Sequence, residues 1–526
     1  MALEMILKLN EAGMTSLHKA GLAGLYLTLK SFSEREEEIE GLEWQLDATE
    51  IKLTWTDKTP KIAFETLIEK SFWIDKDGFI RLSGLEPERE MSFEQRHLLY
   101  DSLLNSFLQY GKHRQKKGKK NLSYEIDEKK IWIKDFEPIS EFVHQKIGDS
   151  WFDNNNTFIR EVEVSGWLFP GASKRHNAHS VSSHSEPIYL ALPLLFAPVG
   201  VIYYLIRSKT KGRKARLALL IPEIKNLQTY FEVRKIIVSQ GVIDLTASSS
   251  TDAALRMLVA LETNSTSNDF AKQLRNNFLC RVNTFGIVSW NEKQKSRTST
   301  RTVISGKLNG FENYLLANTI FKNKWQQIQE KRDRKGELKE PKRFFVTTFC
   351  TREMIADNIA NNKSWYHNTA EFLANKETRE QLYYERKEIG EMVEKAIYEN
   401  ENESLFIKVC HESWRRRLGK LGERARSENA SFQSLVRKEM EKLRTSYARC
   451  KNAETLRETV VDFWSRGGAN ELLQGDGLMQ VLPLFSEKNW RKAKDLALLA
   501  LVSYQPQNEE EKEVFNNKAI SEGESD

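Results

Sequence analysis

Cysteine is scarce in this sequence, and no two of the four cysteines are close together: they are Cys280, Cys350, Cys410 and Cys450. This spacing does not match the paired-cysteine signatures of zinc sites and indicates no disulfide framework, so we expect a reducing, cytoplasmic setting. The sequence also lacks a Gly-Lys-Thr/Ser phosphate-binding motif. ATP-driven work therefore belongs to some other chain.

Targeting and membrane signals are weak as well. Residues 1–8 carry an early acid and no long apolar run, so we expect no signal peptide. The uncharged stretch 188–206 is just long enough to span a bilayer, but Pro193, Pro198 and Gly200 interrupt it. Two buried strands joined at residues 198–200 explain this stretch better, and we predict no membrane partner.

Net charge is small, +6 at pH 7, but the positive charge is clustered. Residues 112–120 hold six cations and no acid: Lys112, Arg114, Lys116, Lys117, Lys119 and Lys120. Residues 207–216 repeat the pattern with Arg207, Lys209, Lys211, Arg213, Lys214 and Arg216. Segment 411–466 holds 14 Lys/Arg against 8 Asp/Glu. Clusters of this kind favour a polyanionic partner, such as nucleic acid, over a merely solvated surface.

At 526 residues the chain is expected to divide into two or more domains. We predict an α+β fold in which a large mixed N-terminal domain with antiparallel hairpins spans residues 1–400. A C-terminal bundle of four or five amphipathic helices follows over 401–505, because apolar residues recur there at spacings of three and four. Residues 401–404 are interpreted as a linker, and the acidic tail 506–526 is expected to be disordered.

Local patterns predict particular elements in the first domain. The expected elements are strands within 44–55, 131–134 and 158–164, a helix over about 92–110, hairpins over 201–220 and 285–303, and helices from about 311 onward with charged faces at 322–343 and 376–397. The first hairpin has apolar strands and a basic tip at 210–213, so the fold would hold these charges away from the core. In the second hairpin, cations after Trp290 are interleaved with Ser and Thr.

Catalytic chemistry finds little support in the residues. His176, His179 and His184 have metal-like spacing, but no Cys, Asp or Glu stands at supporting positions. His18 lies in a glycine-rich, helix-like stretch where most histidines are packed core residues. The acids are scattered among basic residues on helices, where ion pairing is the simpler explanation. We predict no catalytic residue, no metal and no cofactor, while a metal-dependent nucleic-acid-processing enzyme remains the alternative.

Several loops instead offer cations or amides to a nucleic acid. The turn at Pro170 and Gly171 presents donors suited to phosphate: Lys174, Arg175, His176 and His179. Other candidates follow Trp290 or lie in the predicted bundle: Lys293, Lys295, Arg297, Arg301, Arg415, Arg416 and Arg417. The candidates for reading base edges are Asn154, Asn155 and Asn156, although asparagine runs more often form turns.

Two glycine-containing motifs are the most specific feature. Gly13, Gly21 and Gly24 fall within residues 13–25, where the backbone must turn tightly or touch something closely. The second motif is Gly-Trp-Leu-Phe-Pro-Gly-Ala at 166–172. In these two motifs the chain resembles the large subunit of type I CRISPR surveillance complexes (Cascade), which is the eighth Cas family, subtype I-B. The order of a mixed domain followed by a helical bundle extends the likeness over nearly the whole chain.

The resemblance implies a protein without catalytic activity that recognises the protospacer-adjacent motif, holds the 5′ end of the CRISPR RNA and helps to open the target duplex. Implied partners are CRISPR RNA, target double-stranded DNA, the backbone, 5′-handle-binding and small subunits, and a recruited helicase-nuclease. Some relatives serve Tn7-like transposons and would engage transposon targeting proteins instead. Relatives also make the small subunit from an internal start, for which Met392 is our candidate. An RNA-binding scaffold unrelated to CRISPR is a further alternative.

Overall fold

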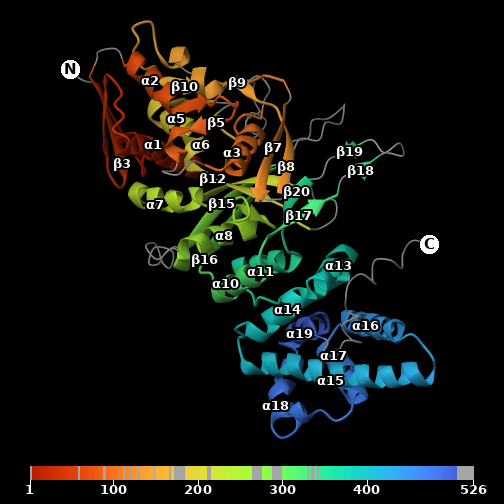
Figure 1. Ribbon diagram of the computed structural model, residues 1–526. Coiled ribbons are helices and arrows are strands. Elements are labelled where there is room, and N and C mark those ends of the chain that lie inside the picture. Colours follow the sequence, from red (N-terminus) through yellow and green to blue (C-terminus); the bar gives the residue numbers. More distant parts are fainter. Residues whose placement is uncertain are drawn as a thin grey trace. The chain divides into compact units, whose positions relative to one another are not determined.

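The computed structural model describes residues 3–56, 60–86, 91–109, 114–118, 120–127, 130–146, 148–164, 168–170, 184–209, 215–263, 275–286, 299–329, 331–332, 338–340 and 343–505 (Figure 1). The predicted fold class is confirmed: antiparallel sheets and helices mix in the N-terminal region, and the C-terminal region is helical. The chain forms two compact units. One comprises residues 1–207, 214–307 and 323–347, and the other comprises 208–213, 308–322 and 348–526.

The first unit begins with a three-stranded antiparallel sheet in the order β1 (Leu3–Lys8), β3 (Glu50–Trp55), β2 (Leu42–Leu46). On β3 the residues Ile51, Leu53 and Trp55 are fully buried and alternate with partly exposed neighbours, which is the period of a strand with one covered face. The predicted strands within 44–55 are therefore confirmed.

Helix α1 (Ser16–Glu34) forms the centre of this unit and contacts α5 (Ile188–Leu195) and α6 (Ala197–Gly200). A Cβ on Gly21 would lie 1.9 Å from the carbonyl oxygen of Pro193, and one on Gly24 would lie 2.1 Å from that of Phe196. Only glycine permits such close backbone packing. The close approach expected of these two glycines is confirmed.

The prediction of two strands over 188–206 was wrong for the first half of this segment. That half is helical, with Pro193 inside α5, and within the segment only β12 (Ile202–Ile206) is a strand. The helices form here because their backbones dock on the glycine face of α1, a tertiary contact that the proline-rich sequence does not reveal. Over the described residues, no helix is long and apolar enough to cross a membrane.

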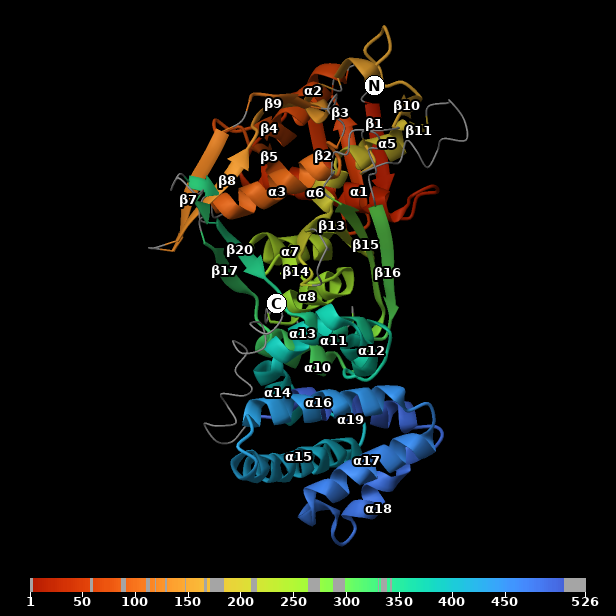
Figure 2. The same cartoon turned by 90° about the vertical axis from the view of Figure 1, so that its right-hand side faces the viewer.

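A five-stranded sheet forms the second half of this unit, in the order β14 (Thr246–Ala247), β12, β13 (Arg216–Pro222), β15 (Phe278–Gly286), β16 (Ser299–Gly306). Both predicted hairpins are confirmed: β12 pairs antiparallel with β13. Strand β15 pairs antiparallel with β16, and Figure 2 shows these two strands side by side. Helices α7 (Leu227–Val238) and α8 (Ser250–Glu262) belong to the same unit. Most of both hairpin tips lies outside the described residues.

Helix α3 (Phe93–Asn105) starts as predicted because the Ser92 and Gln95 side chains form a reciprocal capping box, but it ends earlier than residue 110. The remaining elements of the unit are α2 (Lys61–Ser71), β4 (Phe72–Ile74), β5 (Ile80–Leu82), η1 (Ser83–Leu85), β6 (Arg114–Lys116), β7 (Lys120–Asp127), β8 (Lys130–Phe136), β9 (Ile139–Phe142), η3 (Val143–Lys146), η4 (Gly148–Trp151), β10 (Glu161–Glu163), β11 (Ser185–Pro187), β17 (Lys324–Ile328), β18 (Lys331–Arg332), β19 (Leu338–Glu340) and β20 (Arg343–Thr347). The helical pattern predicted for 322–343 was wrong, since β17, β18 and β19 are strands in this range and β17 pairs antiparallel with β20, which begins at residue 343.

The second unit is helical in its described part. Its elements are α10 (Phe311–Ile320), α11 (Cys350–Ala360), α12 (Thr369–Ala374), α13 (Lys376–Tyr384), α14 (Arg386–Lys395), α15 (Glu401–Ser427), α16 (Phe432–Arg449), α17 (Ala453–Gly467), η6 (Glu471–Leu473), α18 (Gly477–Val481), η7 (Leu482–Phe485) and α19 (Trp490–Ser503). The predicted bundle is confirmed by α15, α16, α17 and α19, drawn in blue (Figure 1). The predicted linker 401–404 is instead the first turn of α15. Glu401 and Glu403 favour a helix start there through the helix dipole.

Candidate nucleic-acid interface

The structure brings the two sequence motifs together at the N-terminus of α1. The ring of His18 packs edge-to-face against Phe169, with ring centroids 6.4 Å apart. Thr15 caps the helix, and its Oγ1 lies 2.7 Å from Nδ1 of His18. The other ring nitrogen, Nε2, lies 2.7 Å from a carboxylate oxygen of Glu186 on β11. His18 is buried, as predicted for a packed histidine.

Glu186 joins this network to a second histidine. Its other carboxylate oxygen lies 3.2 Å from Nε2 of His184, which is exposed. Burial acts to raise the pKa of Glu186, but the hydrogen bonds with His18 and His184 outweigh burial and hold that pKa below its ordinary value. Among the described residues, no group of three or more His, Cys, Asp or Glu side chains is arranged to hold a metal ion.

The nucleic-acid-binding candidates within residues 112–120 lie in different environments. The Arg114 guanidinium donates hydrogen bonds to the carbonyls of Leu104 and Leu108, at 2.8 and 2.6 Å, and so anchors the end of α3. Lys116 pairs with Glu137. Lys117 and Lys120 are exposed. Lys112 and Lys119 lie outside the described residues.

The cations of the two hairpins are described only in part. Arg301 is exposed on β16, opposite Asn283, and Arg216 begins β13 opposite Gly286 and Ile206. The Lys209 ammonium lies 5.3 Å from the centre of the Phe349 ring, a cation–π distance. The candidates outside the described residues are Lys211, Arg213, Lys214, Lys174, Arg175, His176, His179, Lys293, Lys295 and Arg297.

The asparagine loop is a turn built around Asp153. One carboxylate oxygen of Asp153 accepts hydrogen bonds from the backbone N–H groups of Asn155 and Thr157, at 2.8 and 2.9 Å. These bonds, together with the Thr157 hydroxyl, lower the pKa of Asp153. Asn156 adopts a left-handed backbone (φ 58°), which asparagine tolerates better than most residues. Asn154 and Asn155 are exposed, so their side chains remain accessible to a ligand.

The three bundle arginines are held by acids. Arg415 and Arg416 both pair with Glu412 on the same helix, at 2.7 and 2.5 Å, and Arg417 pairs with Glu439 on α16 at 2.9 Å. The hydrogen bonds from the first two arginines lower the pKa of Glu412 to about 2. Exposed cations without a carboxylate partner, over the described residues, include Lys438 and Lys442, which lie one turn apart on α16.

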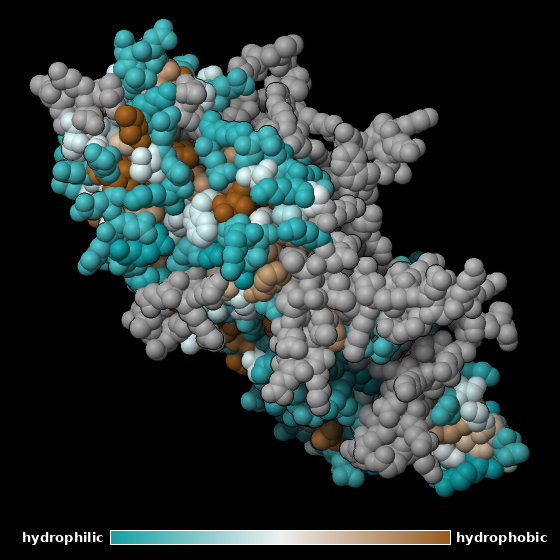
Figure 3. Space-filling view, turned by 45° about the horizontal axis from the view of Figure 1, so that its top comes forward, coloured by the Kyte–Doolittle hydropathy of each residue, from teal (hydrophilic) through white to brown (hydrophobic). Residues whose placement is uncertain are grey.

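Sequence reasoning missed Glu186, the partner of His18, because 168 residues separate the two. Sequence alone held no signal for this pair. It also passed over Lys438 and Lys442, although their spacing of four residues on an amphipathic helix was a usable signal. Figure 3 shows a mainly hydrophilic face with small separate apolar patches, so the described surface in that view offers no broad apolar area.

Comparisons with known proteins cover nearly the whole chain. A family model described as the DevT N-terminal domain matches residues 6–195, and one described as the DevT C-terminal domain matches residues 394–526. A protein of Myxococcus xanthus (strain DK1622), named CRISPR-associated protein Cas8a1/Csx13, is 26% identical over 526 residues. That alignment covers 95% of this chain and 88% of the relative.

Proposed function

We propose that this chain is a member of the Cas8a1/Csx13 family of CRISPR-associated proteins with DevT domains and is the non-catalytic large subunit of a type I Cascade complex. The observation that carries the proposal is similarity to Cas8a1/Csx13 along 95% of the chain. In this role the chain recognises the protospacer-adjacent motif, binds the 5′ handle of the CRISPR RNA and stabilises the opened duplex. It then recruits a nuclease or transposition proteins. The relative's name refers to CRISPR and not to transposition.

Within this role, we assign phosphate binding to exposed cations and base reading to exposed amides. We assign phosphate contacts on the first unit to Lys117, Lys120 and Arg301, which are exposed. Asn154 and Asn155 are our candidates for reading base edges, because an amide both donates to and accepts from a base. The arginines at 415–417 already pair with acids and would have to exchange partners to bind phosphate.

On the bundle, Lys438 and Lys442 are better placed to contact a displaced single strand than these arginines. Both lysines are exposed on the same face of α16, and phosphate binding would cost neither of them an ion pair with a described carboxylate. The double variant K438A/K442A should reduce the salt dependence of single-strand binding by about 1.4 in log–log slope, at roughly 0.7 per contact. R415A is the matched control, and it should change the slope less.

The proposal is tested by co-expressing the chain with CRISPR RNA and the neighbouring CRISPR-associated subunits. We expect one complex that contains this chain and binds double-stranded DNA only when the target carries a particular adjacent motif. The complex lacking this chain should lose that motif dependence. A chain that stays apart from the CRISPR RNA complex, or cleaves nucleic acid by itself through its own acids, would contradict the proposal.

The C-terminal match also bears on a second product of the gene. The DevT C-terminal model begins at residue 394, two residues after Met392, which we propose as an internal start. The resulting chain of residues 392–526 would contain α15, α16, α17 and α19 whole, and it would begin within α14. Several copies of this bundle would then extend the track for the displaced strand.

A further inference from the structure

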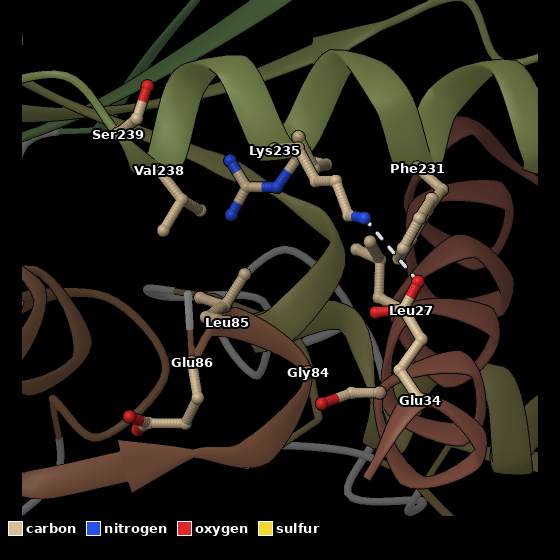
Figure 4. A pocket seen from close by; sticks show the side chains of 11 residues that line it. Leu27, Glu34, Gly84, Leu85, Glu86, Phe231, Lys235, Val238 and Ser239 are labelled. Carbon is tan, nitrogen blue, oxygen red and sulfur yellow. Dashed lines mark hydrogen bonds and ion pairs between the residues drawn. The ribbon is translucent and has the colours of Figure 1, made fainter. Parts of the chain in front are cut away.

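A cavity of about 310 Å³ in the first unit belongs to none of the regions described above. It lies between α1, η1 and α7, and Figure 4 shows it from close by. Its walls are largely apolar: Leu27 comes from α1, Leu85 from η1, and Phe231 and Val238 from α7. Leu85 and Val238 point toward one another across the space. This size and lining are typical of a small-molecule site.

Among the residues that the structure describes, no carboxylate pairs with one buried cation in the wall of this cavity, Arg234. Arg234 is 3% exposed, and over the described residues its guanidinium makes a single long hydrogen bond, 3.4 Å from the carbonyl oxygen of Val199. Its Nε has no partner there. Burial lowers the pKa of Arg234, and the groups that act against burial are tyrosines, not carboxylates. A buried cation left in this state costs free energy unless something pairs with it.

The other charges of the cavity are already neutralised. Lys235 donates to Glu34 at 3.4 Å, the ion pair drawn as a dashed line in Figure 4. Glu86 receives two hydrogen bonds from Arg81, one of them at 2.7 Å, and its side chain points away from α7. With these pairs set aside, Arg234 leaves the cavity with one net positive charge.

We propose that this cavity binds a small organic monoanion, a carboxylate on an apolar body, which pairs with the Arg234 guanidinium. The apolar walls of Leu27, Leu85 and Val238 would cover the body, and the unpaired Nε–H would donate to the carboxylate. A nucleic-acid strand fits less well, because its further phosphates would lie against Glu34 and Glu86. Two sources share this chemistry: a free organic acid and a carboxylate side chain of an associated subunit.

The test uses the purified full chain with 4-methylpentanoate as the probe, followed by calorimetric titration and thermal unfolding. The carboxylate should raise the melting temperature by about 5 °C at a concentration about one hundred times Kd. Its amide, 4-methylpentanamide, has the same shape without the charge and should bind at least about tenfold more weakly. Inorganic phosphate serves as a second control.

The variant R234M should lose binding and, without ligand, melt at the same or a higher temperature, because it removes an uncompensated buried charge. The matched control is R256M. Arg256 is also buried in this unit, but it donates to the carbonyls of Asp244 and Ile243. R256M should therefore melt at a lower temperature yet still bind the carboxylate.

Titrating the assembled complex separates the two sources of the carboxylate. Binding that persists after assembly indicates a free ligand, and binding that disappears indicates that a subunit's carboxylate fills the site. The proposal is overturned if no carboxylate binds the isolated chain, or if R234M lowers the melting temperature as R256M does. A single-stranded oligonucleotide that binds through Arg234 where carboxylates fail would equally overturn it.

Discussion

The contact between α1 and α6 predicts that Gly24→Ala will strongly destabilise the first unit. The added Cβ would lie 2.1 Å from the carbonyl oxygen of Phe196, about 1.3 Å short of ordinary contact at 3.4 Å. It would also lie 2.8 Å from the backbone nitrogen of Gly200. Both obstacles are backbone atoms, so the two helices must separate. No flexible side chain can move aside instead.

The expected magnitude is the difference between two effects. A gap of 0.5–1 Å between the helices would remove roughly a quarter to a half of the dispersion energy of each contact. Overpacking a core typically lowers the free energy of unfolding by about 1–3 kcal/mol, occasionally more. Alanine regains about 1 kcal/mol of helix propensity over glycine. Because the helix interface is fully buried at Ala20, Ala197 and Val199, we expect a net loss of at least about 2 kcal/mol.

Gly419 on α15 is the matched control, since a Cβ there meets nothing within 4 Å. Gly419→Ala should stabilise the second unit by about 0.5–1 kcal/mol through propensity alone. Calorimetric unfolding of the full chain, wild type and each variant, would measure both effects. If the two substitutions change stability with the same sign and similar size, the close packing of α1 against α6 does not hold.

Three further predictions concern the pH response, the asparagine loop and the internal start. Burial lowers the pKa of His411 from 6.5 to about 4, so the stability that rests on its neutral form is present above pH 6.5 and lost as pH falls toward 4. Urea unfolding should show that the wild type loses free energy of unfolding between pH 7.5 and pH 5, and His411→Gln should reduce this loss by about 2 kcal/mol. The same loss in both proteins would contradict this assignment. Replacing Asn154 and Asn155 by Ala should relax the choice of adjacent motif in binding assays, whereas Asn156→Gly should preserve it, because glycine accepts the left-handed backbone at φ 58°; a uniform loss across motifs would point to folding instead. Met392→Leu should remove a short C-terminal fragment from the purified complex and leave the full-length chain folded, at a cost below about 1.5 kcal/mol for a volume-conserving change; a fragment that persists would rule out this start.

Elements with a strong local period were predictable. The alternation on β3, the capping residues of α3 and the apolar stripe of α15 each act within a few residues, so their patterns are visible in the sequence. Where tertiary contact competes with local preference, the predictions failed. Residues 188–195 are helical because they pack on glycines of α1. The linker predicted at 401–404 was wrong for a local reason instead, because Glu401 and Glu403 favour a helix start there.

The candidate site was likewise predictable from the sequence only where it depends on local properties of the chain. Composition located the clusters of positive charge, and the two motifs identified the family resemblance, because both properties are local in the chain. Which cations are already paired depends on neighbours in space: Arg417 pairs with Glu439 on another helix, whereas Lys438 pairs with no described carboxylate. The contact of His18 with Glu186 was likewise decided by the tertiary structure, as was the burial of Arg234 in a cavity wall without a described carboxylate partner. These contacts join residues far apart in sequence, where no periodicity in the sequence indicates them.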